Sequence, residues 1–255
     1  MTDAQVLAHA AQLRIAADTW LSRMIGRAVF RVDVGDAAAL TPDDGARLTA
    51  HVAGNRPAMY YAKVDTGAVA AVRDLSHAGM HVVAVSVALD LDPFAAVTPA
   101  ATPGIVVDGF SPDDAEAVLD IAGSCFRHSR YHVDPDVPRA IAHRIKREWI
   151  ASYVRGQRGD HLLVARSGGR PVGFMAVMSV RQGDRRVRVI DLIGIDNAYQ
   201  RRGIGSALVA AFVDGVGPSE GRRVITQASN IPSLGLYERF GFRVTRTGYV
   251  LHMHV

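Results

Sequence analysis

A short glycine-containing stretch of this chain has the residue types needed to hold a phosphate group. An apolar run ending in Ile193-Gly194-Ile195 is followed by Gln200-Arg201-Arg202-Gly203-Ile204-Gly205-Ser206, and Ile204, Leu208 and Phe212 recur at helical spacing. Glycines in the first turn of a helix leave its unpaired backbone N–H groups open, and the positive end of the helix dipole attracts an anion. Two arginines add positive charge. We therefore expect a phosphate cradle between a strand and a helix.

Two common phosphate-binding patterns do not fit this stretch. A dinucleotide-binding fingerprint requires a third glycine where Leu208 stands, and the chain has no Gly-Lys-Ser/Thr of a Walker-type loop. The stretch instead resembles the pyrophosphate loop of the GCN5-related N-acetyltransferases, the acetyl-CoA-dependent GNAT superfamily, whose pattern is Gln/Arg-x-x-Gly-x-Gly/Ala. A second signature of that family is similar to Asn230 followed by Leu236-Tyr237-Glu238-Arg239-Phe240-Gly241-Phe242.

The order of expected elements carries the same resemblance. Residues 104–255 show the order β-α-α-β-β-β-α-β-α-β-β of the GNAT fold, which implies an α/β (α+β) chain with a mixed central sheet and flanking helices. Residues 60–91 repeat the strand-helix-Gly-strand pattern of residues 222–253. We interpret residues 1–92 as a smaller, degenerate GNAT-like lobe, the alternative being a chance match between two α/β segments. Residues 93–103, which hold prolines and alanines without periodicity, are expected to form a linker.

Three local expectations bear on the fold. Residues 4–25 are predicted to be helical from the loose spacing of their apolar residues. Residues 126–135 are predicted to form a loop before a helix that carries Ile141, Ile145 and Trp149 on one stripe. Residues 242–246 and 249–255 are predicted to be two strands that close the sheet.

The family resemblance implies acetyl-CoA as the cofactor and assigns residues to it. The loop Gln200–Ser206 is implied to hold the pyrophosphate. The backbone of Ile193 and Ile195, with Gly194 between them, is implied to pair with the pantetheine arm, an N–H near Ile193 polarising the thioester carbonyl. Asn230 is implied to contact the pantetheine, although an asparagine also suits the cap of the following helix.

Acetyl transfer to an amine further needs a proton donor for the departing thiolate and a group that deprotonates the amine. The resemblance gives the first role to Tyr237, since a phenol with a pKa of about 10 stays protonated at neutral pH. The alternative is a tyrosine that only packs in the core. Asp191 is the candidate base and Glu148 is its rival, and each also fits a solvated or ion-paired acid.

A finer resemblance concerns the acceptor. The loop Phe126-Arg127-His128-Ser129-Arg130-Tyr131 and the pair Trp149-Ile150 are similar to the dTDP-4-amino-sugar acetyltransferases, which acylate nucleotide-linked sugars. We therefore expect a small-molecule amine as the acceptor, with Arg130, Tyr131 and His132 contacting its phosphate or sugar. Arg130 could instead form an ion pair with Asp134 or Asp136. The acceptor could instead be a protein N-terminus or an aminoglycoside. A third alternative is an acyl-CoA-binding protein without catalysis.

Composition narrows the kinds of partner and site that this chain is expected to have. The chain of 255 residues has 29 basic and 25 acidic residues spread along its length, which disfavours nucleic acid as a partner. Its single cysteine, Cys125, excludes an internal disulfide and is expected to pack in the core. His128 and His132 have no third ligand at a clear spacing, so no metal site is expected. Without a signal pattern or a membrane-length apolar run, we expect a cytoplasmic protein that does not bind membranes; a homodimer stays open.

Overall fold

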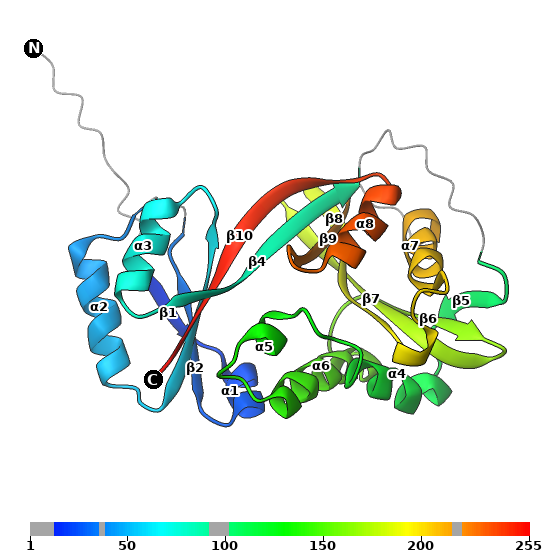
Figure 1. The fold of residues 1–255 in the computed structure, drawn as a ribbon, viewed down its shortest axis with the longest axis horizontal. Helices are drawn as coiled ribbons and strands as arrows, with labels where there is room; N and C mark the ends of the chain where they lie inside the picture. The colour runs from blue at the N-terminus through cyan, green and yellow to red at the C-terminus, as the bar shows by residue number, and fades with distance from the viewer. Residues whose placement is uncertain (1–12, 36–38, 92–101, 216–220) are drawn as a thin grey trace, which may run out of the picture. The chain divides into compact units, whose positions relative to one another are not determined.

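The computed structural model describes residues 13–35, 39–91, 102–215 and 221–255. The chain divides into two compact units. One is formed by Met1–Val83 with Gly248–Val255, and the other by Ala84–Thr247. Strands β4 and β10 run through both units (Figure 1). The predicted linker at residues 93–103 lies outside the described residues except for Thr102 and Pro103. No helix in the described residues is long and apolar enough to cross a membrane.

The first unit is a small sheet with helices packed on it. Its strand order is β1-β2-β3-β10, with β2 and β3 parallel and the other neighbours antiparallel. Its core is an apolar cluster that includes Leu48, Tyr60 and Leu75. The elements are β1 (Arg14–Ala17), α1 (Thr19–Ile25), β2 (Ala28–Asp33), α2 (Pro42–Ala53), β3 (Ala58–Asp65), α3 (Val69–His77), the start of β4 (His81–Leu91) and the end of β10 (Phe242–His254).

The structure corrects the helix predicted for residues 4–25. Arg14–Ala17 is a strand that pairs with β2, and only Thr19–Ile25 is helical. Asp18 separates the two elements, because its side chain accepts a hydrogen bond from the Leu21 N–H and caps the helix. Pairing with a neighbouring strand therefore outweighed local helix propensity. Residues 4–12 lie outside the described residues.

The second unit carries all the predicted site residues. Its strand order is β10-β4-β9-β8-β7-β6-β5, in which only β8 and β9 are shown as a parallel pair. Besides parts of β4 and β10, its elements are β5 (Ile105–Gly109), α4 (Ala115–Ala122), α5 (Arg130–Val133), α6 (Arg139–Val154), β6 (His161–Ser167), β7 (Arg170–Gln182), β8 (Arg185–Ile195), α7 (Ile204–Gly215), β9 (Gly221–Gln227) and α8 (Ile231–Arg239).

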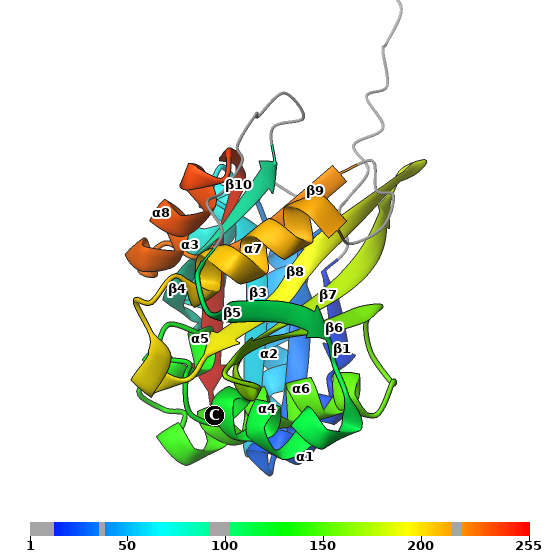
Figure 2. The same ribbon diagram turned by 90° about the vertical axis from the view of Figure 1, so that its right-hand side faces the viewer.

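Helices cover both faces of this sheet. One core cluster packs beneath α7 and α8 and includes Phe212 and Tyr237, while another packs beneath α4 and α6 and includes Phe174 and Leu192. Figures 1 and 2 show these two pairs of helices on opposite sides of β7 and β8. A mixed sheet with flanking helices confirms the predicted fold class.

Two further expectations need correction. Residues 126–135 contain the short helix α5, which the loop prediction did not include. Residues 242–254 form one continuous strand rather than two, since the strand passes from one set of neighbours to another without ending at Gly248. The second half of β10 consequently lies in the first unit.

Candidate active site

Strand β8 contains a bulge at Asp191. Its pairing with β7 moves from Val177–Ile190 to Ala176–Leu192, so Asp191 has no partner of its own. A bulge shifts the alternation of side chains by one residue. As a result Asp191 and Leu192 both face the helices α4 and α6, while Ile190 lies in the core beneath α7.

Strands β8 and β9 separate at the bulge. Their parallel pairing runs from Val187–Gly221 to Ile190–Val224 and is not continued in the described residues, although β8 extends to Ile195 and β9 to Gln227. The backbone groups of β8 beyond Ile190 therefore have no strand partner on the β9 side. Such an edge can pair with an extended ligand inserted between the strands.

The hydrogen-bond pattern shows which residues present these groups. Asp196 donates its N–H to the Val172 carbonyl of the β7 side at 2.9 Å. In an antiparallel ladder successive residues alternate between the two edges. Gly194 therefore faces β7, and the N–H and C=O groups of Ile193 and Ile195 face the opening toward β9. The family resemblance had assigned these same two residues to the pantetheine arm.

The glycine loop leads from this opening into α7. Arg201 has a φ of 63°, and it is the one non-glycine residue with positive φ in the described chain, while Gly203 has a φ of 82°. Gly203 accepts the Ala207 N–H at 3.0 Å as the first bond of the helix. The N–H groups of Ile204, Gly205 and Ser206 precede that bond and have no partner within the helix. They are available to an anion.

Close packing explains both glycines of the loop. A Cβ at Gly203 would lie 2.9 Å from the Thr102 methyl group, and the Thr102 hydroxyl donates to the Gly203 carbonyl at 3.3 Å. A Cβ at Gly205 would lie 3.2 Å from Leu236 of α8 and 3.3 Å from Ile195. Gly205 therefore lets α7 approach both α8 and the open strand.

The other side chains of the glycine loop contact neighbouring residues or pack in the core. Gln200 donates to the Asn197 side chain at 3.1 Å and reaches the Ile195 carbonyl at 3.5 Å. The Arg202 guanidinium lies 5.2 Å from the Tyr199 ring centre and stays exposed. Ile204 is buried at 1% exposure and anchors the helix in the core. The loop thus places exposed arginines beside a fixed helix start.

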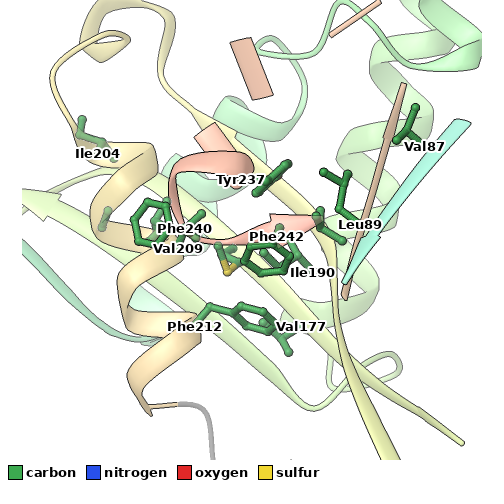
Figure 3. Close-up of a cluster of buried hydrophobic side chains, with 14 of the residues drawn as sticks. Val87, Leu89, Val177, Ile190, Ile204, Val209, Phe212, Tyr237, Phe240 and Phe242 are labelled. Atoms are coloured by element: carbon green, nitrogen blue, oxygen red, sulfur yellow. The ribbon is translucent and has the colours of Figure 1, made fainter. Parts of the chain in front are cut away.

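Tyr237 lies in the core beside the opening. It is 2% exposed on α8, and its ring lies 5.8 Å from that of Phe242; Figure 3 shows both rings in the cluster with Leu89 and Ile190. Burial raises the pKa of the Tyr237 phenol above its usual value. The phenol therefore remains protonated over the whole range in which a general acid is needed.

Asn230 stands at the N-cap position of α8 but its side chain does not cap the helix. Its amide donates to the Thr226 hydroxyl at 3.3 Å. Thr226 lies near the end of β9, next to the opening, and is 6% exposed. Of the two roles considered for Asn230, the structure does not show the capping role, and the pantetheine contact stays a prediction.

Asp191 is held by three donors. Its Oδ2 accepts hydrogen bonds from Trp149 Nε1 at 2.9 Å, the Tyr153 hydroxyl at 2.7 Å and Arg158 Nε at 2.8 Å. Burial by itself would raise the pKa of Asp191, but these bonds and the Arg158 charge outweigh burial and hold the pKa below its usual value. Asp191 is thus a buried, charged group, and a weak proton acceptor.

The rival base lies elsewhere. Glu148 forms an ion pair with Arg155 at 2.6 Å on the exposed side of α6. It does not join the cluster around Asp191 in the described structure. The partners of Asp191 were not predicted, although Trp149 and Tyr153, spaced by four on one helix, could have indicated a shared contact. Arg158 follows the helix and had no such signal.

The acceptor-loop residues come together around α5. Arg130 donates to the Tyr131 hydroxyl at 2.6 Å, and Tyr131 is 3% exposed. His132 shares a 2.6 Å hydrogen bond with Ser129 and a 3.4 Å contact with His143. Burial, with the nearby positive charges of α6, lowers the pKa of His132 to about 4, so this ring is neutral at pH 7. Contact of these residues with an acceptor stays a prediction.

Cys125 lies behind the open strand. A Cβ at Gly194 would come within 2.9 Å of its sulfur and within 2.6 Å of the Phe174 ring. Burial raises the pKa of the Cys125 thiol to about 12, although hydrogen bonds from the backbone of Ile195 and Cys125 oppose this shift. A thiol with so high a pKa is a poor nucleophile. Its packing against Gly194 agrees with the role expected from the sequence.

Comparisons with known proteins agree with this geometry. The model of the acetyltransferase (GNAT) family matches residues 115–242. The spore coat polysaccharide biosynthesis protein SpsD of Bacillus subtilis is 28% identical over 144 residues, which cover 56% of this chain and 48% of SpsD. This chain therefore aligns with about half the length of that curated relative.

Two solved structures share the fold at low sequence identity. A GCN5-related N-acetyltransferase from Kribbella flavida is 14% identical, with 96% of this chain and 90% of that chain covered and a TM-score of 0.59. A tandem GNAT protein from the clavulanic acid biosynthesis pathway is 14% identical, with 89% and 75% covered and a TM-score of 0.57. These two structures show the shared fold, and the matched family model shows that this chain belongs to the acetyltransferase (GNAT) family.

Proposed function

We propose that this protein transfers an acetyl group from acetyl-CoA to a primary amine of a small molecule, and that the acceptor is a nucleotide-linked amino sugar. The observation that carries the proposal is the opening between β8 and β9. It has backbone groups without a strand partner along one edge, a glycine loop at the helix beside it, and Tyr237 and Asp191 on the two faces of the sheet.

The residues present fit acetyl-CoA. Backbone N–H groups of Ile204, Gly205 and Ser206 would hold its pyrophosphate, assisted by the charges of Arg201 and Arg202. The cofactor supplies an acetyl group as an activated thioester. Residues of β8 that face the opening would align the pantetheine arm and donate to the thioester carbonyl.

Tyr237 would provide the proton for the departing thiolate. Its raised pKa keeps the phenol protonated, and the residue is 2% exposed on α8. The packing alternative is compatible with the same burial. Turnover by a variant without the hydroxyl separates the two roles.

For Asp191 we propose a role other than the predicted base. Its Oδ2 is occupied by three donors and its pKa lies below the usual value. A carboxylate in this state takes up a proton reluctantly, but its negative charge attracts a cation. We propose that the other carboxylate oxygen, Oδ1, holds the acceptor ammonium at the opening before the amine loses its proton.

The acceptor class rests on two observations. The relative SpsD is named for spore coat polysaccharide biosynthesis, which is consistent with a sugar substrate. The Arg130 guanidinium lies 4.6 Å from the ring centre of the buried Tyr131. Guanidinium groups bind phosphate. A nucleotide-linked amino sugar presents phosphate groups.

The test is an acetyl-CoA assay with three acceptor classes: dTDP-amino sugars, aminoglycosides and peptides with a free N-terminus. We expect the highest kcat/KM with a dTDP-amino sugar, and a KM increase for that substrate in Arg130→Ala. Turnover confined to peptides would contradict the amino-sugar acceptor. Tight acetyl-CoA binding without turnover of any amine would favour the non-catalytic alternative.

A further inference from the structure

Three polar side chains form a row across strands β7, β8 and β9, at the end away from the glycine loop. Ser179 on β7 is the register partner of Arg188 on β8, and Arg188 is the register partner of Arg222 on β9. Register partners on neighbouring strands project from the same face of a sheet. We call Ser179, Arg188 and Arg222 the arginine row.

The arginine row lies on the face covered by α7. Val177 and Ile190 belong to the core beneath that helix, and Figure 3 shows Val177 next to Phe212. Side chains in a strand alternate with a period of two. Ser179 and Arg188, each two positions from one of these core residues, therefore point to the same side.

Arg188 is buried without acceptors for two of its donors. It is 6% exposed, and its Nε and Nη1 have no hydrogen-bond partner among the described residues. The buried hydroxyl of Ser179 has none either. Nearly all buried polar groups in proteins are hydrogen-bonded, and like charges side by side on adjacent strands repel. The row therefore combines excess positive charge with excess donors.

A second arginine pair continues the row outward. Arg181 and Arg186 are register partners two residues further along β7 and β8, on the same face, and both are exposed. Such a positive surface draws anions toward the buried guanidinium. Two guanidinium charges with a hydroxyl donor match a dianionic phosphate group better than a singly charged carboxylate or a chloride ion.

We propose that the arginine row binds a phosphate group at a site separate from the glycine loop. From position 188 to position 195 along β8, at about 3.3 Å per residue, the separation is roughly 20 Å. One phosphate cannot reach both places. The ligand is either free phosphate or a small phosphate monoester, which share the recognised group.

Thermal unfolding of the full chain at constant ionic strength tests this site. With phosphate replacing acetate, we expect the Tm of the wild type to rise by roughly 2–4 °C, as for a ligand well above its Kd. The Arg188→Met variant should lose the part of this rise that the arginine row contributes. Its Tm in acetate should equal or exceed that of the wild type, because the variant removes a buried charge whose Nε and Nη1 have no partner among the described residues.

Arg202→Ala is the matched control, because the glycine loop also attracts phosphate. We expect Arg202→Ala to keep the response of the arginine row. Equal responses of the wild type and Arg188→Met, or a loss confined to Arg202→Ala, would overturn the proposal.

Calorimetric titration gives a second measurement if Arg188→Met does not fold. Ser179→Ala should bind inorganic phosphate several-fold more weakly than the wild type, and an unchanged affinity would contradict the site. A parallel titration with glycerol 3-phosphate distinguishes the source of the ligand. Tighter binding of the ester indicates a phosphorylated metabolite, and equal binding indicates free phosphate.

Discussion

At the scale of single residues, the candidate chemistry depends on how burial acts on two ionisable groups. Tyr237 is buried among apolar side chains, and its pKa rises. Asp191 is also buried, but hydrogen bonds and a guanidinium hold its pKa down. The same loss of water therefore keeps a proton on one group and a charge on the other, because among the described residues only Asp191 is shown with polar partners.

Tyr237→Phe should bind acetyl-CoA with the affinity of the wild type but turn over ~10²–10⁴-fold more slowly, the usual contribution of a general acid. Phenylalanine fills nearly the same volume, so the Tm should change little. Calorimetry and steady-state kinetics measure the two effects. A kcat near that of the wild type would remove Tyr237 from the mechanism.

Asp191→Asn should lower the free energy of unfolding at pH 7 by roughly 1–3 kcal/mol, because it removes a buried charge that accepts three hydrogen bonds. This range already allows for solvent screening at the partly exposed Arg158. The folded-state pKa of Asp191 is lowered, so its stabilising effect is present above the unfolded value of about 3.9 and is lost as the pH falls through the folded value.

The difference between the wild type and Asp191→Asn should therefore shrink below about pH 4. Urea unfolding at several pH values measures this difference. Glu148→Gln is the control, since it breaks the more exposed ion pair with Arg155 and should cost less than about 1 kcal/mol. A pH-independent difference would show that the Asp191 charge is not what stabilises the cluster.

At the scale of elements, the bulge in β8 and the separation of β8 from β9 decide where the site can form. The bulge at Asp191 turns two successive side chains toward α6, and the loss of pairing beyond Ile190 frees one edge of β8. The glycine loop then starts α7 beside that edge. Each of these features depends on backbone geometry. Most side chains on β8 therefore only need to pack in the core.

Gly203→Val should weaken acetyl-CoA binding at least about tenfold. A β-branched residue is disfavoured at a φ of 82°, and its Cβ would contact Thr102. Gly215→Ala at the far end of α7 is the control, because a Cβ there meets nothing within 4 Å. Unchanged affinity in Gly203→Val, measured by calorimetry, would contradict the assignment of this loop to the pyrophosphate.

At the scale of the whole molecule, the two units contain similar segments. Helix α3 ends near Gly79 and α8 ends near Gly241, both with positive φ, and a long strand follows each helix. Where α8 has Asn230 and Tyr237, the first unit has Ala68 and Leu75. We propose that residues 1–92 derive from a partial GNAT-like lobe without chemistry.

A titration of the full chain should therefore give one acetyl-CoA per chain. The first unit lacks a tyrosine at the position of Tyr237, where the fully buried Leu75 packs in its core. Nor does a Gly-x-Gly loop occur anywhere in residues 1–92 of the sequence. A stoichiometry of two would show that the first unit has kept a cofactor site.

The sequence by itself determined the family, the glycine loop and most elements, because these depend on local patterns: glycines at a helix start, a period of two or 3.6, and turn residues. Even so, Arg14–Ala17 is a strand within the span predicted to be helical, and the two predicted closing strands are one continuous strand, because strand pairing overrode local preference at Arg14–Ala17 and Gly248.

Only the tertiary structure decided how the charged residues are used. The sequence made Asp191 a candidate base. In the structure its carboxylate accepts hydrogen bonds from Trp149, Tyr153 and Arg158 and is held in place by them. Likewise, the arginines appeared evenly spread along the chain, yet strand register sets Arg188 beside Arg222. Both results depend on which distant segments become neighbours, and a pKa or a field depends on distances in space rather than along the chain.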